Sequence, residues 1–188
     1  MTGAVEIWRL QALEAEIGDW PWIEAGMARV FKAAAARWPD DPEAATAFQE
    51  LWLGGYLRDD RGLAYIALDG APVCQVVDVV GYLVASGADQ AVSPRFKTLS
   101  YFKEFVPQFA EFPVHLHMNI DAQYRGRGIG KRLIEALSAD LKRDGVPGVH
   151  IVTAKQQRNV RFYEAAGFQI VAGTIWNDRD LVLMGLKL

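Results

Sequence analysis

The segment Gln123-Tyr124-Arg125-Gly126-Arg127-Gly128-Ile129-Gly130-Lys131 decides the fold. Residues 115–121, just before it, alternate between apolar and polar side chains, which is typical of a strand. Apolar residues continue after it at helical spacing and predict a long helix with a buried stripe of Ile129, Leu133, Leu137 and Leu141. A strand that enters a helix through a glycine-rich turn directs several backbone N–H groups, and the positive end of the helix dipole, to one point. The sequence therefore predicts an anion-binding turn.

This turn contains three glycines and four positively charged residues. Glycine lacks the Cβ atom that would keep an anion away from the backbone, and the cations add local positive charge to a chain whose formal net charge is −3. The glycines are Gly126, Gly128 and Gly130, and the cations are Arg125, Arg127, Lys131 and Arg132. A tight turn followed by a solvated basic helix start is the alternative interpretation.

Two common phosphate-binding motifs do not fit the turn. A Walker A loop requires a glycine where this chain has Arg125, and a serine or threonine where it has Arg132. A dinucleotide fingerprint that starts at Gly126 requires its third glycine where this chain has Lys131. The turn is therefore neither a P-loop nor a Rossmann site.

Length and composition predict one ordinary domain that spans residues 1–188. The chain has 188 residues, of which 51% are apolar, and this is enough to bury a core without a disulfide or a metal. Its single cysteine, Cys74, cannot form an internal disulfide, which fits a reducing compartment. A slightly acidic chain has no general attraction to nucleic acid or anionic lipid. The longest apolar stretch, around Val79 to Ala85, is far shorter than the roughly 20 residues of a membrane-spanning helix, so we expect no membrane span. Glu6 and Arg9 interrupt the first apolar run, so we also expect no signal peptide and a cytoplasmic location.

The remaining pattern predicts an α/β (α+β) fold, with a mixed, mostly antiparallel sheet and helices on both faces. In the first half we expect a strand over 6–11, a helix capped by Asp19 whose apolar face ends at Trp38, a helix from Pro42 to Gly54-Gly55, a hairpin of 63–68 with 76–85, and a short helix over 101–109. In the second half we expect a strand over 149–154, a helix over 158–166, and a hairpin of 168–172 with 181–186.

Two motifs resemble those of the GNAT superfamily of acyl-CoA-dependent N-acetyltransferases. The first is R-x-x-G-x-G, formed by Arg125, Gly128 and Gly130, which in that family holds the pyrophosphate of CoA. The second comprises Asn159, Phe162-Tyr163-Glu164 and Gly167-Phe168. The order of the predicted elements is also similar. The second motif departs from the family at Gln156, where Asn is frequent, and at Asn159, where Ala is usual.

The resemblance implies a site for acetyl-CoA as the acyl donor. It implies that backbone N–H groups of the strand before the turn bind the acyl oxygen and the pantetheine, that the turn holds the diphosphate, and that the hydroxyl of Tyr163 protonates the departing thiolate. The cofactor-binding residues are then Met118, Asn119, Ile120, Arg125, Gly126, Arg127, Gly128, Ile129, Gly130, Lys131, Asn159 and Phe162. The alternative for Tyr163 is an aromatic core position beside Phe162 and Phe168.

Histidines on the strand before the turn are candidates for the base. His115 and His117 share a face of this strand, and either could take the proton of an amine directly or through water, because histidine titrates near neutral pH. His117 is nearer to the implied acyl position. The alternative is a polar pair satisfied by hydrogen bonds, and we expect His150 to be structural.

The run 112–120 resembles, more closely, the acetyltransferase-like domain attached to O-GlcNAcases and its free-standing bacterial relatives. Those relatives carry an acidic residue where this chain has Asn119, so a carboxylate role does not transfer. The family also implies an acceptor pocket near the first helices, the segment before the strand and the last hairpin. Its candidate residues are Trp20, Trp22, Tyr101, Phe102, Trp176, Asp178 and Asp180.

These observations predict an acetyl-CoA-dependent N-acetyltransferase that transfers an acetyl group directly to a small-molecule amine. One alternative is a catalytically silent module that binds acetyl-CoA as a sensor or scaffold. Another is a metal protein that uses His115, His117 and Asp121, whose spacing is seen in metal-binding jelly rolls, although jelly rolls are all-β and this motif leads into a helix. The family resemblance also allows a homodimer through the last strands.

Overall fold

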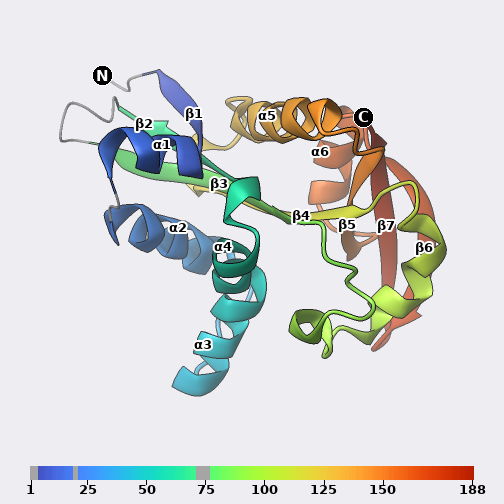
Figure 1. Cartoon of the computed structure of the whole chain (residues 1–188). Helices are drawn as coiled ribbons and strands as arrows, with labels where there is room; N and C mark the ends of the chain where they lie inside the picture. Colours follow the sequence, from blue (N-terminus) through green and yellow to red (C-terminus); the bar gives the residue numbers. More distant parts are fainter. Residues whose placement is uncertain (1–3, 19–20, 71–76) are drawn as a thin grey trace. The chain divides into compact units, whose positions relative to one another are not determined.

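The computed structural model describes residues 4–18, 21–70 and 77–188 (Figure 1). The chain forms two compact units, one made of Met1–Ala85 with His117–Leu137 and the other of Ser86–Leu116 with Ser138–Leu188. Its strands hydrogen-bond in the order β1-β2-β3-β4-β5-β7-β6, and β4 contributes to both units. Since β4 and β5 are parallel while the β1–β2, β2–β3, β5–β7 and β6–β7 pairs are antiparallel, the predicted mixed, mostly antiparallel sheet is confirmed.

The first unit contains β1, β2, most of β3 and the helices that lie between β1 and β2 in the chain. Its elements up to β3 are β1 (Val5–Arg9), α1 (Leu10–Ile17), α2 (Pro21–Ala34), α3 (Pro42–Gln49), a π-helical turn (Glu50–Gly54), α4 (Gly55–Asp59), a 3₁₀ turn (Arg61–Leu63), β2 (Ala64–Asp69) and β3 (Asp78–Ser86), whose last residue belongs to the second unit. The antiparallel pairing of β2 with β3 confirms the predicted hairpin, while residues 71–76, between the two strands, lie outside the described residues.

The start of the chain differs from the prediction. The first strand ends at Arg9, and a helix that was not predicted, α1, follows at once. Leu10 and Leu13 bury its inner face completely. The residue before α1 is Arg9 rather than Ser, Thr, Asp or Asn, so the local sequence carries no signal that a helix begins here. Helix α1 therefore forms because it covers the core.

The next two helices begin as predicted but end elsewhere. Helix α2 ends at Ala34, before Trp38, and its predicted cap Asp19 lies outside the described residues. Helix α3 begins after Asp41, whose carboxylate accepts a hydrogen bond of 2.7 Å from the N–H of Ala44. The prediction that Gly54-Gly55 ends this helix is wrong. Helix α3 ends at Gln49, a π-helical turn continues the helical chain to Gly54, and α4 begins at Gly55 and buries Tyr56 and Leu57. Burial of those side chains outweighs the low helix propensity of glycine.

The second unit contains the last hairpin and the segment before β4. Its elements are a 3₁₀ turn (Pro94–Phe96), a 3₁₀ helix (Ser100–Gln108), the first half of β4 (Val114–Ile120), the end of α5 (Ile129–Arg143), β5 (Gly148–Ala154), α6 (Asn159–Ala165), β6 (Gln169–Trp176) and β7 (Arg179–Lys187). The strand at β5, the helix at α6 and the final hairpin confirm the predictions. The short helix predicted over 101–109 is a 3₁₀ helix that buries Tyr101, Phe102 and Phe105.

Helix α5 has the predicted buried stripe. Ile129, Leu133, Leu137 and Leu141 are each at most 3% exposed. The helix ends where Gly145, at φ 73°, donates its N–H to Lys142 O at 3.1 Å. None of the helices in the described residues is long and apolar enough to span a membrane.

Candidate active site

The turn after β4 is braced within the first unit. The carboxylate of Asp121 accepts from the N–H of Gln123 at 3.0 Å and begins a 3₁₀ turn over Ala122–Tyr124. Arg29 of α2 donates to Asp121 at 3.3 Å, to Asp78 at 2.5 Å and to Val79 O at 2.7 Å. One guanidinium thus ties the end of β4 to the start of β3, so the point at which the chain enters the turn is held from two sides.

Two glycines of the turn adopt a conformation that other residues rarely take. Gly126 and Gly128 both have φ 76°, are exposed, and have no atom within 4 Å of the place that a Cβ would occupy. The first hydrogen bond of α5 runs from the N–H of Arg132 to Gly128 O at 3.1 Å. The amides of residues 129–131 therefore have no acceptor within the helix. The turn therefore has open space beside its glycines and amides that could donate hydrogen bonds, and both features suit the binding of an anion.

The cations around the turn have different partners. Arg127 lies 4.6 Å over the ring of Tyr124 and donates to Gln123 O, and Arg125 donates to Ile120 O at 3.2 Å. Lys131 lies 3.7 Å from Glu135, whereas Arg132 donates to Val5 O at 2.8 Å. All four side chains are exposed. Because Arg125, Arg127 and Lys131 are exposed, an anion in the solvent can approach them.

Tyr124 connects the turn to strand β2. Its hydroxyl donates to the carboxylate of Asp69 at 2.5 Å, and this hydrogen bond raises the pKa of Tyr124. Because the ring also lies under Arg127, Tyr124 links β2 to the cation of the turn. These contacts attach residues 124–127 to the sheet.

Strand β4 pairs with β5 only at its start. The register pairs Val114 with Val149 and His115 with His150, and in the described residues the ladder ends there. The residues expected to bind the acyl group and pantetheine, Met118 to Ile120, lie beyond this end and are partly buried. In the described residues, the N–H groups of residues 118–120 therefore have no ladder partner in β5.

His117 lies among aromatic side chains of the first unit. Its ring centroid is 5.3 Å from that of Trp52, 5.9 Å from that of Phe31 and 6.5 Å from that of Tyr82. Burial among these rings lowers the pKa of His117 to about 4, so the ring is neutral at physiological pH. Asn119 Nδ2 lies 2.9 Å from His117 Nε2 and 2.8 Å from Tyr82 Oη.

His115 has different surroundings, in the second unit. It is 2% exposed, and its ring meets those of Phe96, Phe102 and His150. In the described residues no group of three or more His, Cys, Asp or Glu side chains is placed to hold a metal ion, so His115, His117 and Asp121 are not gathered as the metal alternative requires. His150 is fully buried and bonds Phe112 O through Nδ1 at 2.6 Å, which fits the structural role expected for it.

The helix α6 of the second unit carries the other predicted site residues. Tyr163 is 6% exposed and contacts the rings of Phe162 and Phe168, at centroid distances of 5.1 and 5.2 Å. Burial raises its pKa, so its hydroxyl keeps its proton. Asn159 is exposed and accepts from Thr153 Oγ1 at 3.1 Å. Phe162 is partly buried.

The residues expected to form the acceptor pocket divide between core and surface. Phe102 is fully buried and Tyr101 is 7% exposed, so both belong to the core of the second unit. Trp176 packs against Tyr101 at 5.1 Å and donates from Nε1 to Ser100 Oγ at 2.9 Å. Asp178 forms part of the β6–β7 turn at φ 58°, and Asp180 lies 3.7 Å from Lys155. Trp22 is partly buried in α2, and Trp20 lies outside the described residues.

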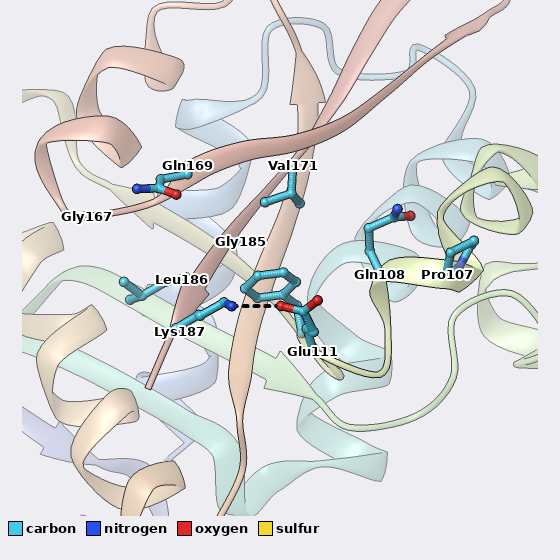
Figure 2. A pocket seen from close by; sticks show the side chains of 10 residues that line it. Pro107, Gln108, Glu111, Gly167, Gln169, Val171, Gly185, Leu186 and Lys187 are labelled. Atoms are coloured by element: carbon cyan, nitrogen blue, oxygen red, sulfur yellow. Dashed lines mark ion pairs between the residues drawn. The ribbon is translucent and has the colours of Figure 1, made fainter.

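The second unit also contains a cavity of about 440 Å³ (Figure 2). Its lining comes from the end of the 3₁₀ helix, the residues before β4, and the β6 and β7 strands. Glu111 and Lys187 form a 2.9 Å ion pair across it. None of the predicted site residues lines this cavity.

Three side chains that support the site were not predicted: Arg29, Tyr82 and Trp52. Each contacts the β4 region from an element distant in sequence, and Trp52 lies on a π-helical turn, a feature frequent at functional sites. No local pattern marks these residues, because their role depends on which elements the fold brings together.

The chain combines a strand, a glycine-rich turn and a long helix with a mixed, mostly antiparallel sheet. A family model for the acetyltransferase (GNAT) domain matches residues 61–170, which is more than half of the chain. The chain belongs to this family and is an acyltransferase by class. Acetyl-CoA is the acyl donor of the family, as the sequence predicted.

Solved structures with similar folds cover nearly the whole chain. The crystal structure of SsHAT is 21% identical, with a TM-score of 0.72 over 97% of this chain and 98% of that one. PH1933 from Pyrococcus horikoshii OT3 is 12% identical, with a TM-score of 0.68 and coverage of 98% of each chain. A Drosophila melanogaster polyamine N-acetyltransferase that forms N-acetylagmatine is 15% identical, with a TM-score of 0.63 over 98% of this chain and 100% of that one. At these identities the likeness concerns the fold.

Proposed function

We propose that this protein transfers an acetyl group from acetyl-CoA directly to the amine of a small molecule. The observation that carries this proposal is the turn at the start of α5, where two exposed glycines at φ 76° and helix-start amides occur beside three solvent-facing cations. A diphosphate needs such amides and cations together. The residues assigned to it are Arg125, Gly126, Arg127, Gly128, Ile129, Gly130 and Lys131.

Backbone groups of β4 are assigned to the reacting end of the donor. The N–H groups of Met118, Asn119 and Ile120 lie beyond the end of the β4–β5 ladder and are proposed to bind the acyl oxygen and the pantetheine amides. Such preorganised donors stabilise the oxyanion that forms when the amine attacks the thioester. Asn159 and Phe162 of α6 are proposed to contact the pantetheine chain.

Two side chains are proposed for proton transfer. When the C–N bond forms and the C–S bond breaks, the thiolate gains a proton and the amine nitrogen loses one. Tyr163 is proposed as the acid, because a phenol hydroxyl carries a proton at neutral pH. His117 is proposed to receive the amine's proton, directly or through water, supported by a neutral ring at physiological pH.

Replacing Tyr163 by Phe tests the acid. The Tyr163→Phe variant keeps the ring contacts with Phe162 and Phe168, so we expect an unchanged melting temperature and a similar Kd for acetyl-CoA. Because the proton donor is lost, kcat is expected to fall about 100-fold. Steady-state kinetics with calorimetric binding separates the two quantities. An unchanged kcat would assign Tyr163 to the aromatic core alone.

The acceptor is proposed to be a small-molecule amine. The fly enzyme with a similar fold is named for a polyamine acceptor, which supports this class of substrate. Calorimetric titration with acetyl-CoA, followed by a panel of amines assayed for released thiol, tests the proposal. Tight binding with no thiol release from any amine would indicate the silent sensor or scaffold instead, and no binding at all would contradict both.

Several broader properties are also proposed. The resemblance of residues 112–120 to the acetyltransferase-like domain of O-GlcNAcases supports a place near that subgroup. Because β4 and α5 each pass from one compact unit to the other, residues 1–188 are proposed to act as one domain. A single cysteine supports the cytoplasm, and β6, with Ile170, Val171 and Ile175 exposed at the sheet edge, supports a homodimer.

A further inference from the structure

Asn119 connects two neighbouring strands through its amide group. It lies two residues after His117 on β4, and its Nδ2 reaches Tyr82 Oη on β3 at 2.8 Å and His117 Nε2 at 2.9 Å. Tyr82 is fully buried, so its hydroxyl is a fixed point, and Asn119 itself is partly buried. A side-chain amide has two N–H hydrogens, and here each one has an acceptor.

This geometry determines where the ring of His117 carries its hydrogen. A neutral imidazole has one protonated nitrogen and one with a lone pair. Since Asn119 donates to Nε2, that nitrogen must hold the lone pair, and the hydrogen must be on Nδ1. The same hydrogen bond engages the only lone pair with which the ring could accept a proton.

The other described neighbours of His117 are aromatic rings, which do not set the position of its hydrogen. The described rings that meet His117 are those of Phe31 on α2, Trp52 on the π-helical turn and Tyr82 on β3. Tyr82 is the titratable group among them, and burial raises its pKa, so it stays neutral. These rings enclose the imidazole without supplying a charge that would favour its protonated form.

We propose that Asn119, anchored by Tyr82, is a positioning residue that keeps the hydrogen of His117 on Nδ1 and releases Nε2 only when an acceptor amine is to be deprotonated. This inference rests on the proposed base role of His117. Asn119 thereby acts as a restraint on the base: in the free protein the lone pair is occupied, and an amine must replace the Asn119 N–H before its proton can be taken.

Substitutions at Asn119 and Tyr82 are expected to weaken or reverse the preference of His117 for the Nδ1–H form. The Asn119→Ala variant removes the donor, so His117 is expected to populate both neutral forms. The Asn119→Asp variant replaces a donor by a carboxylate that accepts, so the hydrogen moves to Nε2 and the pKa of His117 rises by about one unit or more. Tyr82→Phe removes the anchor, keeps the buried ring, and is expected to give a partial loss of the Nδ1–H form.

NMR of the ring nitrogens tests the inference directly on the isotope-labelled full chain. The chain has three histidines, so His115→Gln and His150→Asn variants assign the spectra. Asn177→Asp, on the β6–β7 turn, adds the same charge without touching the network and is the matched control. The inference requires that the hydrogen of His117 is on Nδ1 in the parent and in the control. It also requires a mixture of the two neutral forms in Asn119→Ala and a hydrogen on Nε2 in Asn119→Asp. A parent ring with its hydrogen on Nε2, or spectra that do not respond to Asn119→Asp, would overturn it.

The pH dependence of kcat/KM separates this inference from the proposed function. If His117 is the base, the acid limb of the profile in Asn119→Asp moves to higher pH by the same amount as the pKa measured by NMR. If NMR shows the shift and the rate profile stays in place, the positioning by Asn119 holds and the base role of His117 is wrong. Melting temperatures within the range of the Asn177→Asp control show that each variant is folded.

Discussion

Replacing Gly128 by Ala is expected to weaken binding of CoA about 10- to 100-fold, the loss of one hydrogen bond to a charged group. Gly128 has φ 76°, which an L side chain rarely adopts, so the new Cβ would twist the turn or occupy the open space that we assign to the diphosphate. Either change misdirects the amides at the start of α5. Isothermal titration with CoA measures the effect.

Gly145 provides a matched control at the other end of the same helix. It has φ 73° and also has no atom within 4 Å of the place that a Cβ would occupy, so Gly145→Ala introduces the same backbone strain of about 1 kcal/mol. We expect both variants to lose similar thermal stability and only Gly128→Ala to lose affinity. Equal affinity in the two variants would mean that the turn does not hold the diphosphate, and the acetyl-transfer proposal would lose its main support.

The second large effect is loss of stability in acid. The pKa of His150 is about 4 in the folded protein, because burial lowers it, against an ordinary value of 6.5. Its Nε2 has no hydrogen-bond partner in the described structure, so a proton there would be buried and unpaired. Between these pH values the unfolded chain binds more protons than the folded one. The free energy of unfolding therefore falls as the pH falls from 6.5 towards 4, by about 3 kcal/mol for this group.

An asparagine at this position isolates the effect. The His150→Asn variant can still donate to Phe112 O but does not titrate, so its urea-unfolding curves should depend less on pH between about 6.5 and 4 than those of the parent. Phe109→Leu removes the ring stacked on His150 at 5.1 Å and should lower stability equally at every pH. A parallel pH dependence in His150→Asn and the parent would rule out His150 as the source of acid sensitivity.

The predictions that the structure confirms depend on neighbouring residues. The spacing of Ile129, Leu133, Leu137 and Leu141 placed α5 correctly, because a helix buries residues that recur every three to four positions. Asp41 with Pro42 located the start of α3, because capping involves residues three positions apart. The glycines at φ 76° lie within the motif that indicated the family.

The predictions that failed depend on burial that no local pattern reveals. Helix α1 has no start signal and forms over Leu10 and Leu13. The helical chain continues from the π-helical turn, which ends at Gly54, into α4, which begins at Gly55, because Tyr56 and Leu57 are buried. Both results show packing overriding local preference.

By itself, the sequence indicated the family and the order of most elements, since these depend on short motifs and periodic patterns, and the family resemblance implied the acyl donor. The tertiary structure decided the environment of each histidine. His115 and His117 share a strand face, yet His115 is enclosed by Phe96, Phe102 and His150, while His117 meets Trp52 and a hydrogen-bonded Asn119. The partners that set a proton's position come from strands and helices far apart in the chain, and only folding brings them within hydrogen-bond distance.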